Sequence, residues 1–406
     1  MSPSEILCAL IAIPSVNPMG RELSGPIYFE QRLSDWLVSF FESIGANFER
    51  IEVAPGRSNV IARYDSPGAT QTLLFDAHQD TVPIDNMTIE PFTPQVIDGR
   101  ITGRGAADVK GGLAAMLYAF ARLVEEKPNG AANVVLSCPC DEEFTTIGIR
   151  DLVTYWQANA GKSRLLTAKP DGAIVAEPTE LDVVIAHRGV TRFRVHTLGR
   201  ACHSSDPSQG RNAIYTMARA VRYLEDYASW LPKSVPIHAL CGRPTLSVGR
   251  IYGGQSVNIV PDSCTIEIDR RLVPGEDPLV AWSTVREQLT ERFGPHIVTD
   301  EAWISSPALS NHDNAWLAEP LLNCIENVAG RHCSLGVAYC THASTISSAG
   351  VPSVVFGPGS IAQAHTEDEY IEVKQLDQAA EVYFQFACCK ALNQISKSQR
   401  INGDDE

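Results

Sequence analysis

Two histidines and a set of carboxylates in this 406-residue chain stand where a divalent metal could bind. His78 and Asp80 directly follow the apolar run Leu73–Phe75, which has the composition of a short buried strand. Asp108 stands in a glycine-rich loop just before a segment of helical periodicity. A carboxylate fixed at a helix start, near a histidine and a second carboxylate, suits a divalent metal. A His-x-Asp motif alone is more often incidental, so the interpretation depends on further ligands.

Further candidate ligands follow later apolar segments. Glu142 and Glu143 come after the segment ANVVLS. Glu177 comes after GAIVA, and His365 lies in the loop beyond VVF. A run such as Asp-Glu-Glu is usually a solvated charge cluster, and Glu-Pro-Thr can simply start a helix. The position that all these residues share, at the ends of expected strands, favours one common site, because such ends hold the ligands of open α/β sheets.

The ligand set indicates the kind of metal chemistry. Histidines and carboxylates without sulfur suit Zn²⁺, and also Co²⁺ or Mn²⁺. Five ligands are one too many for a single tetrahedral zinc and suit two ions that share a bridging carboxylate. Because Glu142 and Glu143 are adjacent, both cannot easily face one ion. One of them would ligate, and the other would take the proton of an attacking water and pass it to a leaving amine.

Strands that alternate with helices must position these residues. Apolar runs predict strands, and helical periodicity predicts helices between them. The expected strands are 58–64, 72–75, 132–137, 172–176 and 354–356, and helices are expected within 1–50 and over 109–124, toward Trp156, and over 312–330 and 374–395. This order predicts an α/β fold with a mainly parallel sheet and flanking helices, and the tail after 395 is expected to fray.

A change of pattern near residue 183 predicts a second domain. Residues 183–199 alternate apolar and polar side chains, as in a half-exposed pair of antiparallel strands. Further strands are expected at 245–252 and 263–271, with helices over 212–230 and 278–293. We expect a two-layer α+β, ferredoxin-like domain at 183–298, inserted into a catalytic domain of 1–182 and 299–406. Its sheet edge is expected to serve as a dimer surface.

Composition limits the classes of partner. Hydrophobic residues make up 44% of the chain and charged residues 20%, as in ordinary globular proteins. The net charge of −15 argues against a nucleic-acid partner. The sequence contains no run of about 18 apolar residues, so no membrane span is expected. The apolar segment Leu7–Ile13 is not preceded by the basic residues of an export signal. Eleven cysteines without a C-x-x-C pair indicate a reducing, cytoplasmic location and no thiolate zinc site.

Five motifs together resemble one known family. They are HQDTVP at 78–83, GRGAADVKGG at 103–112, DEE at 141–143, AEPT at 176–179 and AHTEDEY at 364–370. In this order they resemble the dinuclear-zinc amidohydrolases that include acetylornithine deacetylase, succinyl-diaminopimelate desuccinylase, aminoacylase and glutamate carboxypeptidase. The resemblance covers nearly the whole chain.

The resemblance implies a role for each candidate ligand. Asp108 would bridge two divalent ions, with zinc the expected metal. One ion would add His78 and Glu177, and the other would add Glu143 and His365.

The resemblance also implies the roles of neighbouring residues. Asp80 would orient the His78 ring, and Glu142 would be the general base. The peptide bond Asp108–Val109 would be cis. His203, in the inserted domain, would help to polarise the scissile carbonyl, in the partner subunit of a homodimer. Taken by itself, a histidine before two serines is ordinarily part of a capping loop.

Several other positions match residues that line the substrate pocket of the family. Asn258 and Arg271 match positions that hold the substrate carboxylate, and arginine is a good bidentate partner for that group. The alternative for Arg271 is an ordinary strand arginine at the surface. Gly357, Pro358 and Gly359 match a pocket loop, although their residue types also fit a plain turn.

The closest resemblance is to acetylornithine deacetylase, with one departure. Where that enzyme has Thr-Glu-Ala, this chain has Thr341-His342-Ala343, which changes the charge that a substrate amine would meet. We expect hydrolysis of an N-acyl amino acid similar to N-acetylornithine. The alternatives are a dipeptidase, carboxypeptidase or desuccinylase on the same scaffold, and a ligand-binding protein without catalytic activity.

Overall fold

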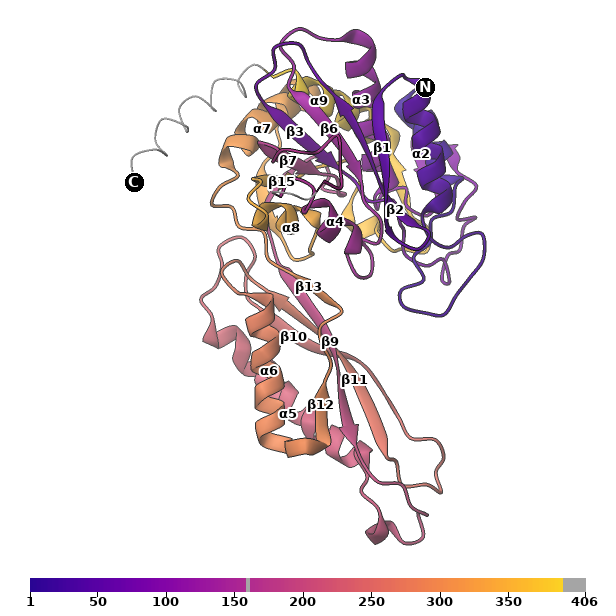
Figure 1. The fold of residues 1–406 in the computed structure, drawn as a ribbon, viewed down its shortest axis with the longest axis vertical. Coiled ribbons are helices and arrows are strands. Elements are labelled where there is room, and N and C mark those ends of the chain that lie inside the picture. The colour runs from indigo at the N-terminus through magenta and orange to yellow at the C-terminus, as the bar shows by residue number, and fades with distance from the viewer. Residues whose placement is uncertain (158–160, 390–406) are drawn as a thin grey trace. The chain divides into compact units, whose positions relative to one another are not determined.

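The computed structural model describes residues 1–157 and 161–389, which form two compact units (Figure 1). The first unit comprises residues 1–185 and 311–335 and continues from 341. The second comprises residues 186–310 and 336–340. Each unit has its own hydrophobic core.

An eight-stranded sheet organises the first unit. Its strand order is β1 (Asn47–Ala54), β2 (Arg57–Tyr64), β6 (Asn133–Cys138), β3 (Thr72–Asp76), β7 (Gly172–Val175), β15 (Ser353–Val355), β8 (Val183–His187) and β14 (Ser334–Val337). The neighbours β6, β3, β7 and β15 are parallel, whereas β1–β2, β2–β6 and β15–β8 are antiparallel. The parallel strands are almost wholly buried, as expected for strands covered on both faces. The predicted α/β fold is confirmed.

Helices cover this sheet. They are α1 (Pro3–Ile11), α2 (Gln31–Ser43), α3 (Lys110–Glu126), α4 (Ile147–Leu152), α7 (Ala315–Ala329), α8 (His342–Ser348) and α9 (Val373–Ala387). Helices α3 and α9 pack along each other (Figure 1). Helix α1 packs against both of them, and α7 packs against α9. Gly112 of α3 lies so close to the sheet that an added Cβ would be 2.7 Å from that of Ala176. This close approach requires glycine and seats the start of α3 directly on the strand ends.

A small sheet lies beside the start of α3. It contains β4 (Gln95–Ile97), β5 (Arg100–Thr102) and β16 (Tyr370–Glu372). The antiparallel pairing of β16 with β5 joins the chain before Asp108 to the chain after His365.

The second unit is a two-layer α+β structure. Its sheet has the order β10 (Thr245–Gly253), β11 (Ser263–Leu272), β9 (Gly189–Leu198) and β12 (Ile297–Thr299), and β13 (Ile304–Ser306) also pairs with β9. Helices α5 (Ala213–Ser234) and α6 (Pro278–Phe293) pack on this sheet and on each other. Short 3₁₀ turns lie at Pro207–Gln209 and Gly294–His296 here and at Ile361–Gln363 in the first unit.

One expectation about strand pairing was wrong. Residues 183–199 do not form a strand pair, because β8 pairs with β15 of the eight-stranded sheet while β9 pairs with β11. The burial patterns give the reason. Alternate residues of β9 are buried, as on a sheet with one open face, whereas most of β8 is buried on both sides. The expected helix over 374–395 is present as α9 to Ala387, and residues from 390 lie outside the described part of the chain.

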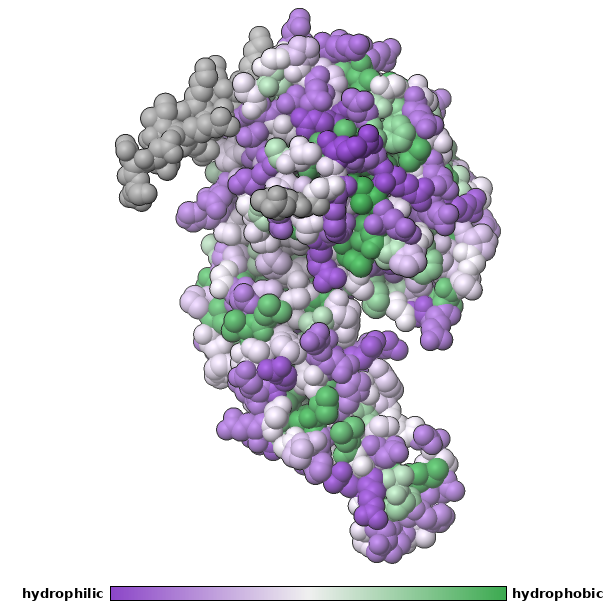
Figure 2. All heavy atoms as spheres, in the orientation of Figure 1, coloured by the Kyte–Doolittle hydropathy of each residue, from purple (hydrophilic) through white to green (hydrophobic). Residues whose placement is uncertain are grey.

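Exposed apolar side chains are frequent on the second unit. Figure 2 shows hydrophobic patches there among polar residues. The exposed apolar side chains of this unit include Tyr215, Trp230, Ile251, Tyr252, Val257, Ile259, Leu279 and Val280. Two of them, Ile251 and Tyr252, lie on the edge strand β10. Exposed apolar side chains on a sheet edge are typical of a surface that contacts another protein.

All eleven cysteines lie among the described residues, and all are free thiols. Over residues 1–157 and 161–389, none of the helices has the length and hydropathy needed to span a membrane.

Candidate metal centre

The candidate ligands follow the parallel strands at the centre of the large sheet. His78 comes just after β3, Glu143 after β6 and Glu177 after β7, and His365 lies in the loop beyond β15. These strands are consecutive neighbours and run in one direction, so their carboxyl ends share one edge. Asp108 reaches the same edge from the start of α3, and the bond Asp108–Val109 is cis.

Asp108 lies at the middle of this group. Its two carboxylate oxygens lie 3.2 Å from Nε2 of His78 and 3.3 Å from Nε2 of His365. The same His365 nitrogen lies 3.4 Å from Oε2 of Glu143. Ligand atoms of His78, Asp108 and Glu143 all lie within 4.8 Å of one another. Four of the predicted metal ligands are therefore brought together.

Glu177, the fifth predicted ligand, is buried at the same edge of the sheet. Burial and the negative charge of Asp108 raise its pKa well above the usual range, against the opposing charge of His78. Burial and the charge of Asp108 also raise the pKa of Glu143 to about 8. Since the charge of Asp108 contributes to both shifts, Glu143 and Glu177 both lie within reach of its field.

The chemistry of these donors fits divalent cations. The buried Oε1 of Glu143 has no hydrogen-bond partner among the described residues. Carboxylates crowded in this way need compensating positive charge, since leaving a buried charge unpaired is costly. Imidazole and carboxylate ligands without sulfur match zinc and related ions.

Asp80 connects the ligand strand to the Glu142–Glu143 loop. Its carboxylate accepts hydrogen bonds from the backbone N–H groups of Glu142 (3.0 Å) and Glu143 (3.1 Å). Nδ1 of His78 donates to the backbone carbonyl of Asp80 at 2.9 Å and lies 3.5 Å from its carboxylate. Asn17 donates to the same carboxylate at 2.8 Å. Asp80 therefore fixes the ring of one candidate ligand and the backbone of the candidate base together.

His342 is buried beside the centre and is paired with an acid. Its Nδ1 lies 2.8 Å from Oδ2 of Asp76, and its ring centroid lies 6.3 Å from that of His78. Its Nε2 has no hydrogen-bond partner within the described part of the chain. The chain thus lacks an acid at position 342 but has one at position 76, directly against it.

The predicted glycine-proline loop packs on the Glu177 segment. The backbone carbonyl of Glu177 would lie 2.6 Å from a Cβ placed on Gly357, so only glycine fits there. Thr179 receives a hydrogen bond from the N–H of Gly357, and Gly359 accepts one from the N–H of Glu180. Gly357, Pro358 and Gly359 thus lie at the ligand edge of the sheet.

The remaining predicted residues belong to the second unit. His203 and Asn258 lie on adjacent exposed segments, since the N–H of Ser204 donates to the carbonyl of Asn258 at 3.0 Å. The Nδ1 of His203 lies 2.7 Å from Oγ of Ser205. The Arg271 guanidinium donates to both carboxylate oxygens of Asp269, at 2.6 and 3.1 Å. Within this unit, Arg271 therefore already has an acidic partner.

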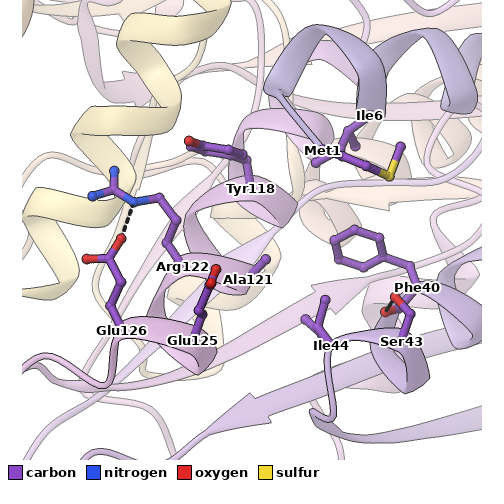
Figure 3. Close-up of a pocket in the computed structure, with 10 residues that line it drawn as sticks. All are labelled: Met1, Ile6, Phe40, Ser43, Ile44, Tyr118, Ala121, Arg122, Glu125 and Glu126. Atoms are coloured by element: carbon purple, nitrogen blue, oxygen red, sulfur yellow. Dashed lines mark hydrogen bonds and ion pairs between the residues drawn. The ribbon is translucent and has the colours of Figure 1, made fainter.

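A pocket elsewhere in the first unit contains none of the predicted residues. It has a volume of about 670 Å³ and lies between α1, α2 and α3 (Figure 3). Its wall is formed by apolar side chains such as Phe40 and Ile44 and by the ion pair Arg122–Glu126, of 2.8 Å. No histidine lines it, so it offers no ligand set like that around Asp108.

Metal binding at the centre is expected to release protons, more at about pH 6.5 than at about pH 8.5. Hydrogen bonds with Asp108 and Glu143 raise the pKa of His365 to about 11, and the pKa of Glu143 is about 8. Below these values the ligands hold protons that must leave, so metal affinity rises with pH. Calorimetric titration with Zn²⁺ in buffers of different ionisation enthalpy measures the release. Equal release at both pH values would contradict the expectation.

Comparison with known proteins gives one family and a shared fold. The family model of peptidase family M20/M25/M40 matches residues 74–388. An M20 family metallo-carboxypeptidase from Sulfolobus solfataricus has a TM-score of 0.78 at 19% identity, over 97% of this chain and 100% of that chain. A tripeptidase from Staphylococcus aureus has a TM-score of 0.73 at 20% identity, over 96% and 98%. A Bacillus subtilis dinuclear metal binding peptidase from the M20 family has a TM-score of 0.63 at 15% identity, over 95% of this chain and 96% of that chain.

Proposed function

Since this chain belongs to peptidase family M20/M25/M40 and is a metallopeptidase-type hydrolase, we propose that it hydrolyses the amide bond of a small N-acyl amino acid. The observation that supports this most is the convergence of two histidines and the acidic groups on Asp108, with Glu142 held next to them. A metal-dependent hydrolase of linear amides uses such a combination of metal ligands and a free carboxylate.

We propose that two divalent ions bind here, with zinc the expected metal. Asp108 would bridge them, His78 and Glu177 would complete one site, and Glu143 and His365 would complete the other. Bound ions would polarise the scissile carbonyl and make a water molecule more acidic.

Glu142 would move the proton. Its carboxylate accepts a proton from the attacking water as the water oxygen bonds to the carbonyl carbon. It then donates this proton to the nitrogen as the carbon–nitrogen bond breaks, which gives a free amine and a carboxylate. Burial raises the pKa of Glu142, although the charges of His78 and His342 oppose this shift, and a raised pKa helps a carboxyl group to hold the proton between the two steps.

We propose N-acetylornithine as the leading substrate, because the segments 203–214 and 339–370 also resemble acetylornithine deacetylase. His342 replaces the acid that acetylornithine deacetylase has at this position and so changes the charge that a substrate amine would meet. Its pairing with Asp76 keeps a carboxylate next to position 342. The second candidate is a dipeptidase or carboxypeptidase, since the similar solved structures include a carboxypeptidase and a tripeptidase.

A hydrolysis screen tests the proposed substrate. The zinc-reconstituted protein would be given N-acetylornithine, acetyl-methionine, acetyl-citrulline, succinyl-diaminopimelate and a set of dipeptides, with Glu142→Gln protein as the blank. Preference for N-acetylornithine supports the proposal. Preference for dipeptides would move the function to the second candidate, and no hydrolysis of any substrate would favour a ligand-binding protein.

We further propose that the protein is a homodimer in which His203 acts on the substrate bound by the partner subunit. The exposed edge strand β10 and its apolar side chains Ile251 and Tyr252 support a surface between copies. Mixing His203→Ala subunits with Glu142→Ala subunits is expected to restore part of the activity, because one site of each mixed dimer regains both residues. Recovery no greater than the sum of the separate variants would contradict action across the dimer.

We also propose a reducing, cytoplasmic location, which the free cysteines support.

A further inference from the structure

Glu369 is a carboxylate at the candidate metal centre that has no role in the proposed reaction. It lies four residues after His365, just before β16, and its exposed fraction is 0%. A buried carboxylate of this kind is costly unless hydrogen bonds satisfy both of its oxygens.

The hydrogen bonds of Glu369 all go to one short loop. Oε2 accepts from Nη1 of Arg104 at 2.7 Å and from the N–H of Gly105 at 2.9 Å. Oε1 accepts from the N–H groups of Ala107 at 2.8 Å and Asp108 at 3.0 Å. Three backbone N–H groups of this loop, from Gly105, Ala107 and Asp108, therefore point at one side chain, as in a backbone nest that binds an anion.

This loop is the one that presents Asp108. Its glycines Gly103 and Gly105 have positive φ values of 143° and 84°, which let the backbone turn its N–H groups inward. The backbone carbonyl of Glu369 also accepts from the N–H of Gly103 at 3.0 Å. Without the Glu369 carboxylate, three backbone N–H groups would lose their acceptor, and the buried guanidinium of Arg104 would keep only the carbonyl of Pro83, 3.2 Å away.

The same contacts connect two ligand segments that are far apart in sequence. Asp108 stands on the loop, and His365 stands on the segment that contains Glu369. The pairs Tyr370–Thr102 and Ile371–Ile101 continue the connection along β16 and β5. The side chains of the two segments also meet, since Nε2 of His365 lies 3.3 Å from Oδ2 of Asp108.

We propose that Glu369 is a positioning residue of the metal centre, which holds the Asp108 loop against the His365 segment so that both side chains meet the same ions. This inference depends on the proposed metal centre, but not on which amide is hydrolysed. Carboxylates that support metal ligands indirectly typically affect metal affinity by about 10- to 100-fold.

The test is the metal affinity of the full-length Glu369→Gln protein. Glutamine keeps the size of the side chain but turns an NH₂ donor toward groups that are themselves donors. We expect Zn²⁺ affinity, measured by chelator competition, to fall by about 10- to 100-fold. We also expect an altered absorption spectrum of the Co²⁺-substituted protein and partial recovery of turnover at high metal concentration. Wild-type affinity with a wild-type Co²⁺ spectrum would overturn the proposal.

Two further variants separate positioning from general stability. Glu372→Gln alters a carboxylate three residues later that pairs with Arg100 at the surface, 2.7 Å away, and should keep wild-type affinity. Leu37→Ala opens a cavity in the core of the same unit, away from the loop, and should lower the melting temperature without changing metal affinity. If Leu37→Ala loses as much affinity as Glu369→Gln, the effect is general destabilisation and the proposal fails.

Failure of the proposed function gives a different result. A wild-type protein that binds Zn²⁺ but hydrolyses no amide would reject the proposed reaction, while the affinities above would still decide the role of Glu369. A wild-type protein that binds no Zn²⁺ would reject the metal centre and Glu369 with it.

Discussion

Replacing Glu142 with glutamine is expected to lower turnover by about 100- to 10,000-fold while the protein keeps its metal. Glutamine has nearly the same shape but cannot accept the proton of the attacking water. The backbone N–H of Glu142 donates to the Asp80 carboxylate at 3.0 Å, and this hydrogen bond does not involve the Glu142 side chain, so the loop should stay in place. Steady-state kinetics with the preferred substrate, together with metal analysis of the same sample, measures both effects.

Glu143→Gln is the matched control for this experiment. It changes the adjacent residue in the same way, but Oε2 of Glu143 lies 3.4 Å from His365 and within the ligand group around Asp108. We expect this variant to lose metal, whereas Glu142→Gln should lose turnover alone. Near-wild-type turnover in Glu142→Gln would contradict its assignment as the base, and loss of metal in that variant would make it a ligand.

The second large effect is expected from Asp108→Asn. Asp108 contacts both His78 and His365, so an amide in its place cannot supply two anionic oxygens to two ions. We expect loss of bound metal and a fall in turnover on the order of 1,000-fold or more. Added Zn²⁺ should also no longer raise the melting temperature, because binding to the folded state provides that stabilisation. Elemental analysis and thermal unfolding with and without Zn²⁺ test these results.

Asp313→Asn provides the control for Asp108→Asn. Asp313 also pairs with a histidine, His312 at 2.9 Å, but both side chains are exposed. This variant should retain metal, turnover and the Zn²⁺-dependent rise in melting temperature. An Asp108→Asn protein with a full complement of metal would contradict the bridging role.

Much of the fold could be predicted because its signals are local. The apolar runs at 72–75, 132–137 and 172–176 became β3, β6 and β7, and the helix predicted over 278–293 is α6. Such runs report burial along one element, which depends on the order of side chains in a short segment. The pairing of β8 and β9 was predicted wrongly, because alternation alone does not say which sheet a strand joins.

Most of the candidate ligands could also be identified from the chain, since they follow strands, whereas Asp108 precedes helix α3. His78, Glu143 and Glu177 stand at strand ends, and parallel neighbours bring such ends to one edge. The supporting residues gave no such signal. Asn17 stands in a segment without a motif, and Asp76 differs from its strand neighbours only by being charged. Glu369 stands within the AHTEDEY motif, but the resemblance assigned it no role.

The sequence by itself determined the candidate ligands, the strand ends near which they stand and the candidate base, because these follow from residue order within short segments. Only the tertiary structure showed that Asp76 lies against His342 and that Glu369 holds the Asp108 loop. These contacts join residues 266 and 261 positions apart in the chain. Their geometry depends on how the small sheet and α8 pack against the large sheet, and no short segment of the sequence determines that packing.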